Sequence, residues 1–393
     1  MLGTGERAVI DPVVVAGVRT PRGKGSKKGG LHGMAPVELV AHLLGVLPVA
    51  PSAVDDVVLG CATQVDDQGA NLARTATLVA GWDARVPGAT LNRFCASGLD
   101  AIGVAAARVR AGDAAVVVAG GVESVSRVPV FADRGPLYAD PAIAAKIGSI
   151  HMGVAADLVA TLDALGRDAL DDYAERSRAK ARAAPRSPSL VATGALAHDE
   201  LLDGAPDRAA LAALPALFAD RPTEDAIARA RYPEAGPLRH VHTKGNSPQL
   251  ADAAALVVIA DRSAAERLGL APRARIVATT TCAVDPVIML TAGQLAAERV
   301  LARAGIAARD VAVFEFAEAF AALCLRFMRA MDADHERVNP NGGTIALGHA
   351  FGATGAILAL NVIDELERRE ARYGVACVSG AAGLGSAALF ERL

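Results

Sequence analysis

The sequence is poor in aromatic residues and carries no excess of either charge. Only 4% of its 393 residues are Phe, Trp or Tyr, and 40 Lys and Arg against 43 Asp and Glu leave a formal net charge of −3. A chain with this balance has no basic field that would attract nucleic acid. Because 52% of the residues are hydrophobic, disorder is excluded and two or three core-forming units are expected.

Paired cysteines, a signal peptide and a convincing membrane span are also lacking. The five cysteines are widely spaced and form no C-x-x-C pair, which argues against a zinc site or a disulfide framework. Residues 1–11 show no basic segment followed by an apolar one, so no signal peptide is expected. Residues 344–363 carry no formal charge, but their histidine, asparagine and glycines favour a loop and a buried helix. The sequence thus predicts a cytoplasmic protein without a metal site or a membrane anchor.

Short apolar runs alternate with helical patterns in two regions of the chain. Such alternation predicts α/β units with a mostly parallel sheet. The predicted strands are 13–16, 57–59, 116–119, 256–260, 275–280, 311–316 and 375–378. The predicted helices are 99–110, 168–184, 291–304 and 355–369.

The two regions resemble each other around one reactive residue each. Cys95 precedes Gly98 at the start of a small-residue helix, and His349 precedes Gly352 in the same way. This repetition suggests an internal duplication in which two α/β halves face each other. Between them, residues 126–249 are richer in charge and proline and are interpreted as an inserted domain that shapes a substrate site.

Cys95 and His349 are the strongest candidates for chemistry. A cysteine at a helix N-terminus gains from the helix dipole and free backbone N–H groups, which lower the thiol pKa; the alternative is an inert core cysteine. A neutral imidazole in the glycine-rich loop before a helix can take a thiol proton or donate to a thioester oxygen; the alternative is a polar surface histidine. Glu318 follows an apolar strand and is either a site carboxylate or an acid in the first turn of a helix.

These residues stand in blocks that resemble the signatures of thiolases, the acyl-CoA C-acyltransferases. The blocks are NRFCASGL at 92–99, GGVES at 120–124, AEAF at 317–320 and GGTIALGH at 342–349. They occur in the family's order along the whole chain. The resemblance implies a five-layer αβαβα core, built from two duplicated βαβαβαββ halves, plus an inserted loop domain that binds coenzyme A.

The same resemblance divides the chain. Residues 1–125, completed by about 250–272, correspond to the N-terminal thiolase half. Residues 126–249 correspond to the loop domain, which binds CoA and substrate, and residues 273–393 to the C-terminal half.

The resemblance also implies roles for single residues. Cys95 corresponds to the cysteine that takes an acyl group as a thioester, and His349 to the histidine that activates it and helps to bind the thioester oxygen. Glu318 is counted with them as a catalytic candidate. The positions implied in substrate binding are Met152, Ser247, Met289, Ala317, Gly380 and Ala381.

The implied substrate is an acyl-CoA or an acyl carrier protein, and no separate cofactor, metal, nucleic acid or membrane partner is expected. A homodimer or homotetramer is expected as well. The apolar strand at 116–119 needs cover, and thiolases place an equivalent strand at a two-fold interface.

Two positions depart from the family's pattern. An ungapped alignment of the C-terminal block puts Ser379 where the family has its second catalytic cysteine, with Cys377 two residues earlier. In the family this cysteine is the base that removes a proton from the α-carbon of the second acyl-CoA. Because two residues along a strand span about 6–7 Å, Ser379 is favoured over Cys377 at this position. Ala317 stands where the family has Asn or His to hold a water in the oxyanion hole. These changes predict an intact first acyl transfer and a slow second step.

Three functions remain open from the sequence. The favoured one is a thiolase-type acyltransferase, with acetyl-CoA as the expected donor. It would work through a cysteine thioester in Claisen condensation or in thiolysis of 3-ketoacyl-CoA. The second is an acyl-transferring or thioester-hydrolysing relative without Claisen activity. The third is a non-catalytic scaffold subunit.

Overall fold

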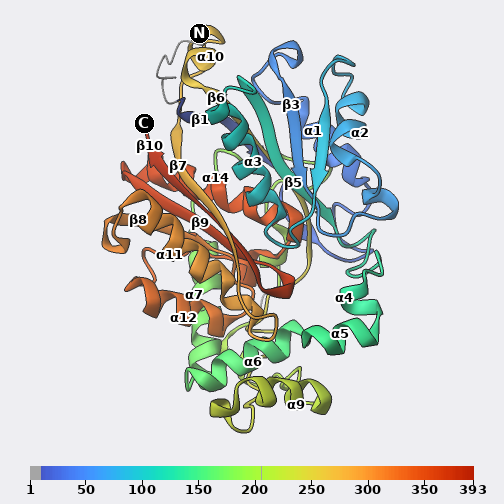
Figure 1. Ribbon diagram of the computed structural model, residues 1–393, viewed down its shortest axis with the longest axis vertical. Coiled ribbons are helices and arrows are strands. Elements are labelled where there is room, and N and C mark those ends of the chain that lie inside the picture. Colours follow the sequence, from blue (N-terminus) through green and yellow to red (C-terminus); the bar gives the residue numbers. More distant parts are fainter. Residues whose placement is uncertain (1–9, 205) are drawn as a thin grey trace, which may run out of the picture.

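The computed structural model describes residues 10–204 and 206–393 (Figure 1). In the first half of the described chain the strands are β1 (Pro12–Arg19), β2 (Gly23–Lys24), β3 (Asp56–Gly60), β4 (Gly88–Leu91) and β5 (Val116–Ser124). In the second half they are β6 (Ala251–Asp261), β7 (Ala274–Ala283), β8 (Val311–Phe316), β9 (Tyr373–Ser379) and β10 (Leu384–Arg392). Hydrogen bonds join them in the order β4-β3-β5-β6-β1-β7-β10-β9-β8, and β2 pairs with β6.

Helices cover these strands and separate the two halves. The helices before residue 184 are α1 (Pro36–Leu44), α2 (Leu72–Val79), α3 (Ser97–Ala111), α4 (Pro136–Ala139), α5 (Pro141–Ile147), α6 (Met152–Leu162) and α7 (Arg167–Ala183). The later ones are α8 (Arg208–Ala212), α9 (Pro222–Arg231), α10 (Arg262–Arg267), α11 (Ala292–Ala304), α12 (Ala321–Met331), α13 (Thr344–Leu347) and α14 (Phe351–Arg369). Each predicted helix and strand overlaps an observed one.

Alternate side chains of the strands face different helical layers. In β5, Val116 and Val118 pack in the core that contains α1 and α2, whereas Val117 and Ala119 pack in the core that contains α3 and α14. The outer face of the C-terminal strands packs against α11 and α12. The layers are therefore α1/α2, N-terminal strands, α3/α14, C-terminal strands and α11/α12, which is the expected five-layer αβαβα arrangement.

The sheet is mixed, so the prediction of a mostly parallel sheet is wrong. Strand β3 pairs in parallel with β4 and β5, and β8 pairs in parallel with β9. Strands β6 and β10 return beside their neighbours and pair only antiparallel. Their apolar runs carry no signal of direction, because a strand buried on both faces reads the same in either orientation.

Strand β5, which was expected to be covered by a second copy of the chain, is already covered within the chain. Every residue of β5 is buried, and β5 lies between β3 and β6 inside the sheet. The partly exposed edge on this side is β4. The reason given from the sequence for an oligomer therefore fails.

The apolar stretch 344–363 is α13 and most of α14, and it is buried in the core. By length and composition, one stretch of the described chain, Pro141–Leu162, is apolar enough to cross a membrane. This stretch is divided into α5 and α6 near Gly148, which ends α5 in the left-handed region at φ 71°.

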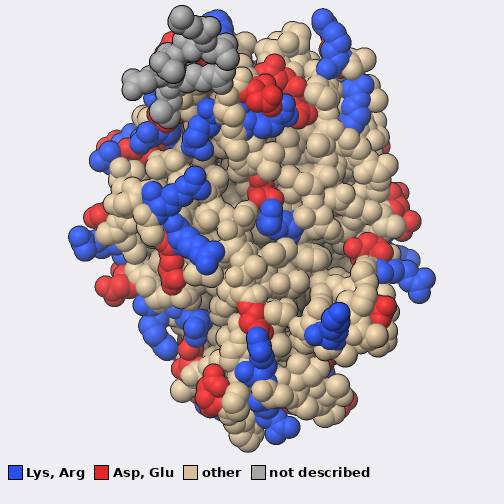
Figure 2. Space-filling model, viewed as in Figure 1, with Lys and Arg blue, Asp and Glu red and all other residues tan. Residues whose placement is uncertain are grey.

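Residues 126–249 contribute no strand to the sheet, and most of their helices gather at the end of the molecule away from the two termini (Figure 1). On the face drawn in Figure 2, acidic and basic side chains are interspersed and separated by wide uncharged areas. That face thus carries no field of one sign.

Candidate active site

The first turns of α3 and α14, which follow the two catalytic candidates in the chain, cross in contact. A Cβ atom on Gly98 would lie only 2.4 Å from the carbonyl oxygen of Gly352. This is well inside van der Waals contact, so the crossing requires a glycine here. Cys95 lies in the turn before α3, and His349 lies just before α14. The two duplicated motifs thus meet at the centre of the molecule.

The backbone of His349 is fixed by the segment that leads into β6. Its N–H donates to the carbonyl of Gln249 at 2.8 Å, and its carbonyl accepts from the N–H of Ala251 at 3.1 Å. Gly348, at φ 98°, supplies the backbone bend before it. The Nδ1 atom of the ring lies 2.8 Å from the hydroxyl of Thr354, which leaves Nε2 as the nitrogen available for proton transfer.

The carboxylate of Glu318 is buried beneath the loop that carries His349. Its oxygens accept hydrogen bonds of 2.8 to 3.1 Å from the side chains of Tyr173, Ser177 and Asn339 and from the N–H of Ile345. It does not line the cavity at Cys95. These contacts make Glu318 a positioning residue for the start of α13 instead of the catalytic residue expected from the sequence.

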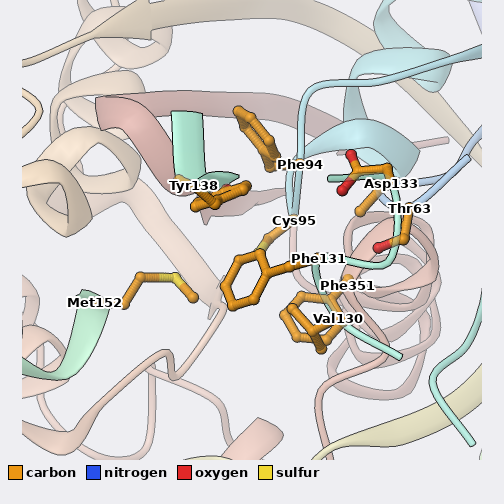
Figure 3. A pocket seen from close by; sticks show the side chains of 11 residues that line it. Thr63, Phe94, Cys95, Val130, Phe131, Asp133, Tyr138, Met152 and Phe351 are labelled. Carbon is orange, nitrogen blue, oxygen red and sulfur yellow. The ribbon is translucent and has the colours of Figure 1, made fainter. Parts of the chain in front are cut away.

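The thiol of Cys95 faces a cavity of about 30 Å³ (Figure 3). In this view Tyr138 and Phe94 lie above the thiol. Asp133 and Thr63 lie to one side of it, and Met152 lies on the side opposite Asp133 and Thr63. A space of this size has room for little more than water, so side chains must move before an acyl group can enter.

A second cavity, of about 240 Å³, adjoins the first. The two share the wall residues Phe131, Tyr138, Met152 and Ala381. Met289 lines the second cavity only. Three of the predicted substrate-binding residues, Met152, Met289 and Ala381, therefore line one or both of these two neighbouring cavities.

Burial keeps both reactive groups neutral. It raises the pKa of the Cys95 thiol to about 12, and the nearby carboxylate of Glu123 adds to this effect. Burial, with the guanidinium of Arg22, lowers the pKa of His349 to about 4. The prediction that Cys95 has a lowered pKa is thus wrong, because burial outweighs the benefit of the helix N-terminus. The site holds a thiol and a neutral imidazole, so the thiol proton must leave during the attack.

The hydroxyl of Ser379 is already engaged. It donates to the carbonyl of Leu290 at 2.6 Å and accepts from the N–H of Gly293 at 2.9 Å. Cys377 is fully buried in the outer core with α11 and α12, whereas Cys95 belongs to the central core. Burial raises the pKa of Cys377 far above its ordinary value. Neither residue therefore presents a free base to Cys95.

The remaining predicted positions lie close to the site but differ in what they offer. Ala317 is buried in the central core together with Cys95 and has no polar side-chain atom to hold a water. The N–H of Gly380 is bonded to the carbonyl of Leu384 at 2.6 Å. Ala381 forms part of the wall of both cavities.

Ser247 has a side chain suited to a bound ligand. It is 6% exposed, and its hydroxyl has no hydrogen-bond partner among the described residues. The neighbouring Asn246 fixes the loop by donating to Asp171 at 2.8 Å. A buried hydroxyl without a partner costs free energy, which an amide or hydroxyl of a substrate would recover. No cluster of three metal-ligating side chains occurs in residues 10–204 and 206–393.

Three residues near Cys95 were missed by the sequence reasoning. Glu123 accepts backbone hydrogen bonds from Ala62 at 2.9 Å and Gly352 at 2.9 Å and so ties the two halves together. Its place in the GGVES block was the available signal. Asp133 and Tyr138 line the Cys95 cavity from an irregular segment whose sequence gives no such signal.

Comparison with known proteins agrees with this geometry. Two family descriptions match the chain: "Thiolase, N-terminal domain" over residues 12–190 and "Thiolase, C-terminal domain" over residues 270–392. The chain is 37% identical to a beta-ketoadipyl-CoA thiolase of Escherichia coli, covering 96% of this chain and 98% of that protein. It is 36% identical to a 3-ketoacyl-CoA thiolase of Enterobacter sp. (strain 638), covering 97% and 99%.

A solved structure shows the same likeness in three dimensions. The crystal structure of the Bacillus anthracis acetyl-CoA acetyltransferase superposes with a TM-score of 0.82. Its sequence identity with this chain is 30%, and the match covers 98% of this chain and all of the other.

Proposed function

The chain belongs to the thiolase family, a family of acyltransferases that act on CoA thioesters, and from this premise we propose that it carries an acyl group as a thioester on Cys95. The expected donor is acetyl-CoA. The acyl group then passes to a second acyl-CoA in Claisen condensation, or to CoA in thiolysis of a 3-ketoacyl-CoA. The observation that supports this proposal is the contact of Gly98 with Gly352, because Gly98 follows Cys95 by three residues and Gly352 follows His349 by three residues.

The first half-reaction needs only these two side chains. The Cys95 sulfur attacks the thioester carbonyl while its proton moves to the neutral imidazole of His349. The carbon–sulfur bond to CoA then breaks, and the CoA thiolate takes the proton from His349. A neutral His349 is required at the start, and its low pKa of about 4 supplies this form throughout the neutral range.

The second half-reaction is the altered one. A thioester α-proton has a pKa far above 7, so its removal needs a base in contact and donors that hold the enolate oxygen. Ser379 has a hydroxyl in place of the family's thiol, and Ala317 removes a water-holding side chain. We expect a second step that is slower than the first.

A second candidate function is hydrolysis of the acyl-enzyme without carbon–carbon chemistry. The engagement of the Ser379 hydroxyl with Leu290 and Gly293 favours it, because the usual carbon-acid base is then absent. Water would replace the enolate as the group that attacks the thioester, which would release a free acid.

Product analysis separates these functions. Purified protein is incubated with acetyl-CoA, and with acetoacetyl-CoA plus CoA, beside a Cys95→Ala variant. Acetoacetyl-CoA formed or cleaved by the wild type alone supports the transferase. Acetate alone supports hydrolysis, and identical product levels in both proteins would refute both. The homo-oligomeric state and the cytoplasmic location stay predictions, which sedimentation and cell fractionation test.

A further inference from the structure

The Cys95 cavity lacks a base at the positions where the family's pattern leads one to expect it. The hydroxyl of Ser379 donates a hydrogen bond to the carbonyl of Leu290, and Cys377 is buried in the outer core. A carbon acid can still react if another basic side chain reaches the acyl α-carbon. Carboxylates next to Cys95 are the natural candidates, since a carboxylate is ionised at neutral pH.

Two of the nearby carboxylates are already committed. Glu123 accepts hydrogen bonds from backbone N–H groups at Ala62, Thr63 and Gly352 and from Gln68, and burial raises its pKa. Glu224, on the wall of the second cavity, is paired with Arg221 and accepts from the N–H of His151. Both act as structural acceptors.

Asp133 differs from both. It lines the same 30 Å³ cavity as the Cys95 thiol, and its side chain is exposed. In Figure 3 the side chains of Asp133 and Thr63 lie on the side of the thiol opposite Met152. Within residues 10–204 and 206–393 its oxygens have no hydrogen-bond or ion-pair partner of their own. Burial raises the pKa of the Tyr138 phenol, and the charge of the nearby Asp133 adds to this effect.

The backbone around Asp133 is held in an uncommon shape. Phe131 and Arg134 both have left-handed conformations, at φ 68° and φ 50°. Residues other than glycine rarely adopt this region. The ring centroids of Phe131 and Tyr138 are 4.2 Å apart. Those of Tyr138 and Phe94 are 6.2 Å apart, and Phe94 is next to Cys95 in the chain. The second of these contacts joins the segment to the residue that precedes Cys95.

We propose that the Asp133 carboxylate is the base of the second half-reaction, in place of the missing cysteine. This rests on the proposed function. Asp133 takes an α-proton from the second acyl-CoA, and the electron pair of that C–H bond becomes the enolate. The enolate carbon attacks the acyl carbonyl on Cys95, the carbon–carbon bond forms and the bond to the Cys95 sulfur breaks. The proton on Asp133 returns to the Cys95 thiolate, so the enzyme ends as it began.

The test separates the two half-reactions in the full-length protein. Acylation is followed as the burst of free CoA thiol from acetyl-CoA. Base action is followed as exchange of the acetyl hydrogens of acetyl-CoA in D₂O, together with acetoacetyl-CoA formation. The variants are Asp133→Asn and Asp133→Ala, with Asp140→Asn as the matched control. Asp140 lies on the same segment but off the cavity wall, and asparagine can keep its cap on α5.

In Asp133→Asn we expect exchange and condensation to fall by about 100-fold or more, while the burst stays within about twofold of wild type. Formate added to Asp133→Ala should restore exchange, because a small carboxylate can occupy the vacated space. The control should match wild type in all three measurements.

Three results would overturn the assignment. They are exchange at the wild-type rate in Asp133→Asn, loss of the burst together with exchange in that variant, and a wild type that acylates Cys95 but exchanges no hydrogen. A wild type that shows no burst would instead defeat the proposed function itself.

Discussion

Replacing Gly98 by alanine tests whether the crossing of α3 and α14 places the catalytic pair. The new Cβ would lie 2.4 Å from the carbonyl oxygen of Gly352 and 3.2 Å from the backbone nitrogen of Ala356. Both are backbone atoms, which cannot rotate away as a side chain does. Ordinary carbon–oxygen contact begins about 1 Å farther out, so α14 must shift by a large part of that distance.

The cost of the shift follows from this geometry. Overpacking a well-filled core costs about 1–3 kcal/mol, and a backbone clash belongs at the upper end of that range. Moving α14 also moves His349, which stands just before it. A misplacement of this size can slow a catalysed step by about 100-fold. We therefore expect Gly98→Ala to lose both stability and most of its acyl-transfer rate.

The matched control lies on the same helix. A Cβ on Gly103 would meet Thr279 at 3.6 Å, an ordinary contact. Gly103→Ala should gain about 0.5–1 kcal/mol from helix propensity and keep its activity. Thermal unfolding and the burst of CoA thiol measure the two quantities. Equal stability and equal burst rates in Gly98→Ala and Gly103→Ala would refute the reasoning.

Four further predictions concern single groups in the site. Ser379→Cys should speed condensation or thiolysis by about tenfold or more in a steady-state assay, whereas Cys377→Ala should change turnover little. Loss of turnover in Cys377→Ala, with little change in Ser379→Cys, would instead show that Cys377 is the base. Glu318→Gln should lower the melting temperature and the acylation rate together, and loss of turnover at unchanged stability would restore its catalytic role. Acylation should persist from pH 7 to about pH 5 and fall toward pH 4, where His349 gains a proton. Between about pH 6.5 and pH 4, His349 binds a proton in the unfolded chain but stays neutral in the folded one. This difference should lower the free energy of unfolding as the pH drops through that range, which a pH titration of unfolding measures.

The sequence predicted the elements well because their signals are local. The apolar runs of β5 and β8 and the glycine that ends α3 are each visible within a short stretch of chain. The repeated spacing from Cys95 to Gly98 and from His349 to Gly352 also predicted that two halves face each other. In the structure Gly98 and Gly352 lie in contact.

Other features depend on segments far apart in the chain, which local patterns do not report. The pKa of Cys95 is set by burial and by Glu123, not by the helix start alone. The antiparallel return of β6 follows a long inserted region. Asp133 reaches the cavity only because an irregular segment folds over Cys95.

The central claim is that Cys95 carries the acyl group and that His349 enables its transfer. The direct measurement is peptide mapping by mass spectrometry after a rapid acid quench of the protein with acetyl-CoA. The account predicts an acetyl group on the peptide that contains Cys95 in the wild type, and far less of it in His349→Ala at the same quench time. An acetyl group on another cysteine, or none on any peptide, would contradict it.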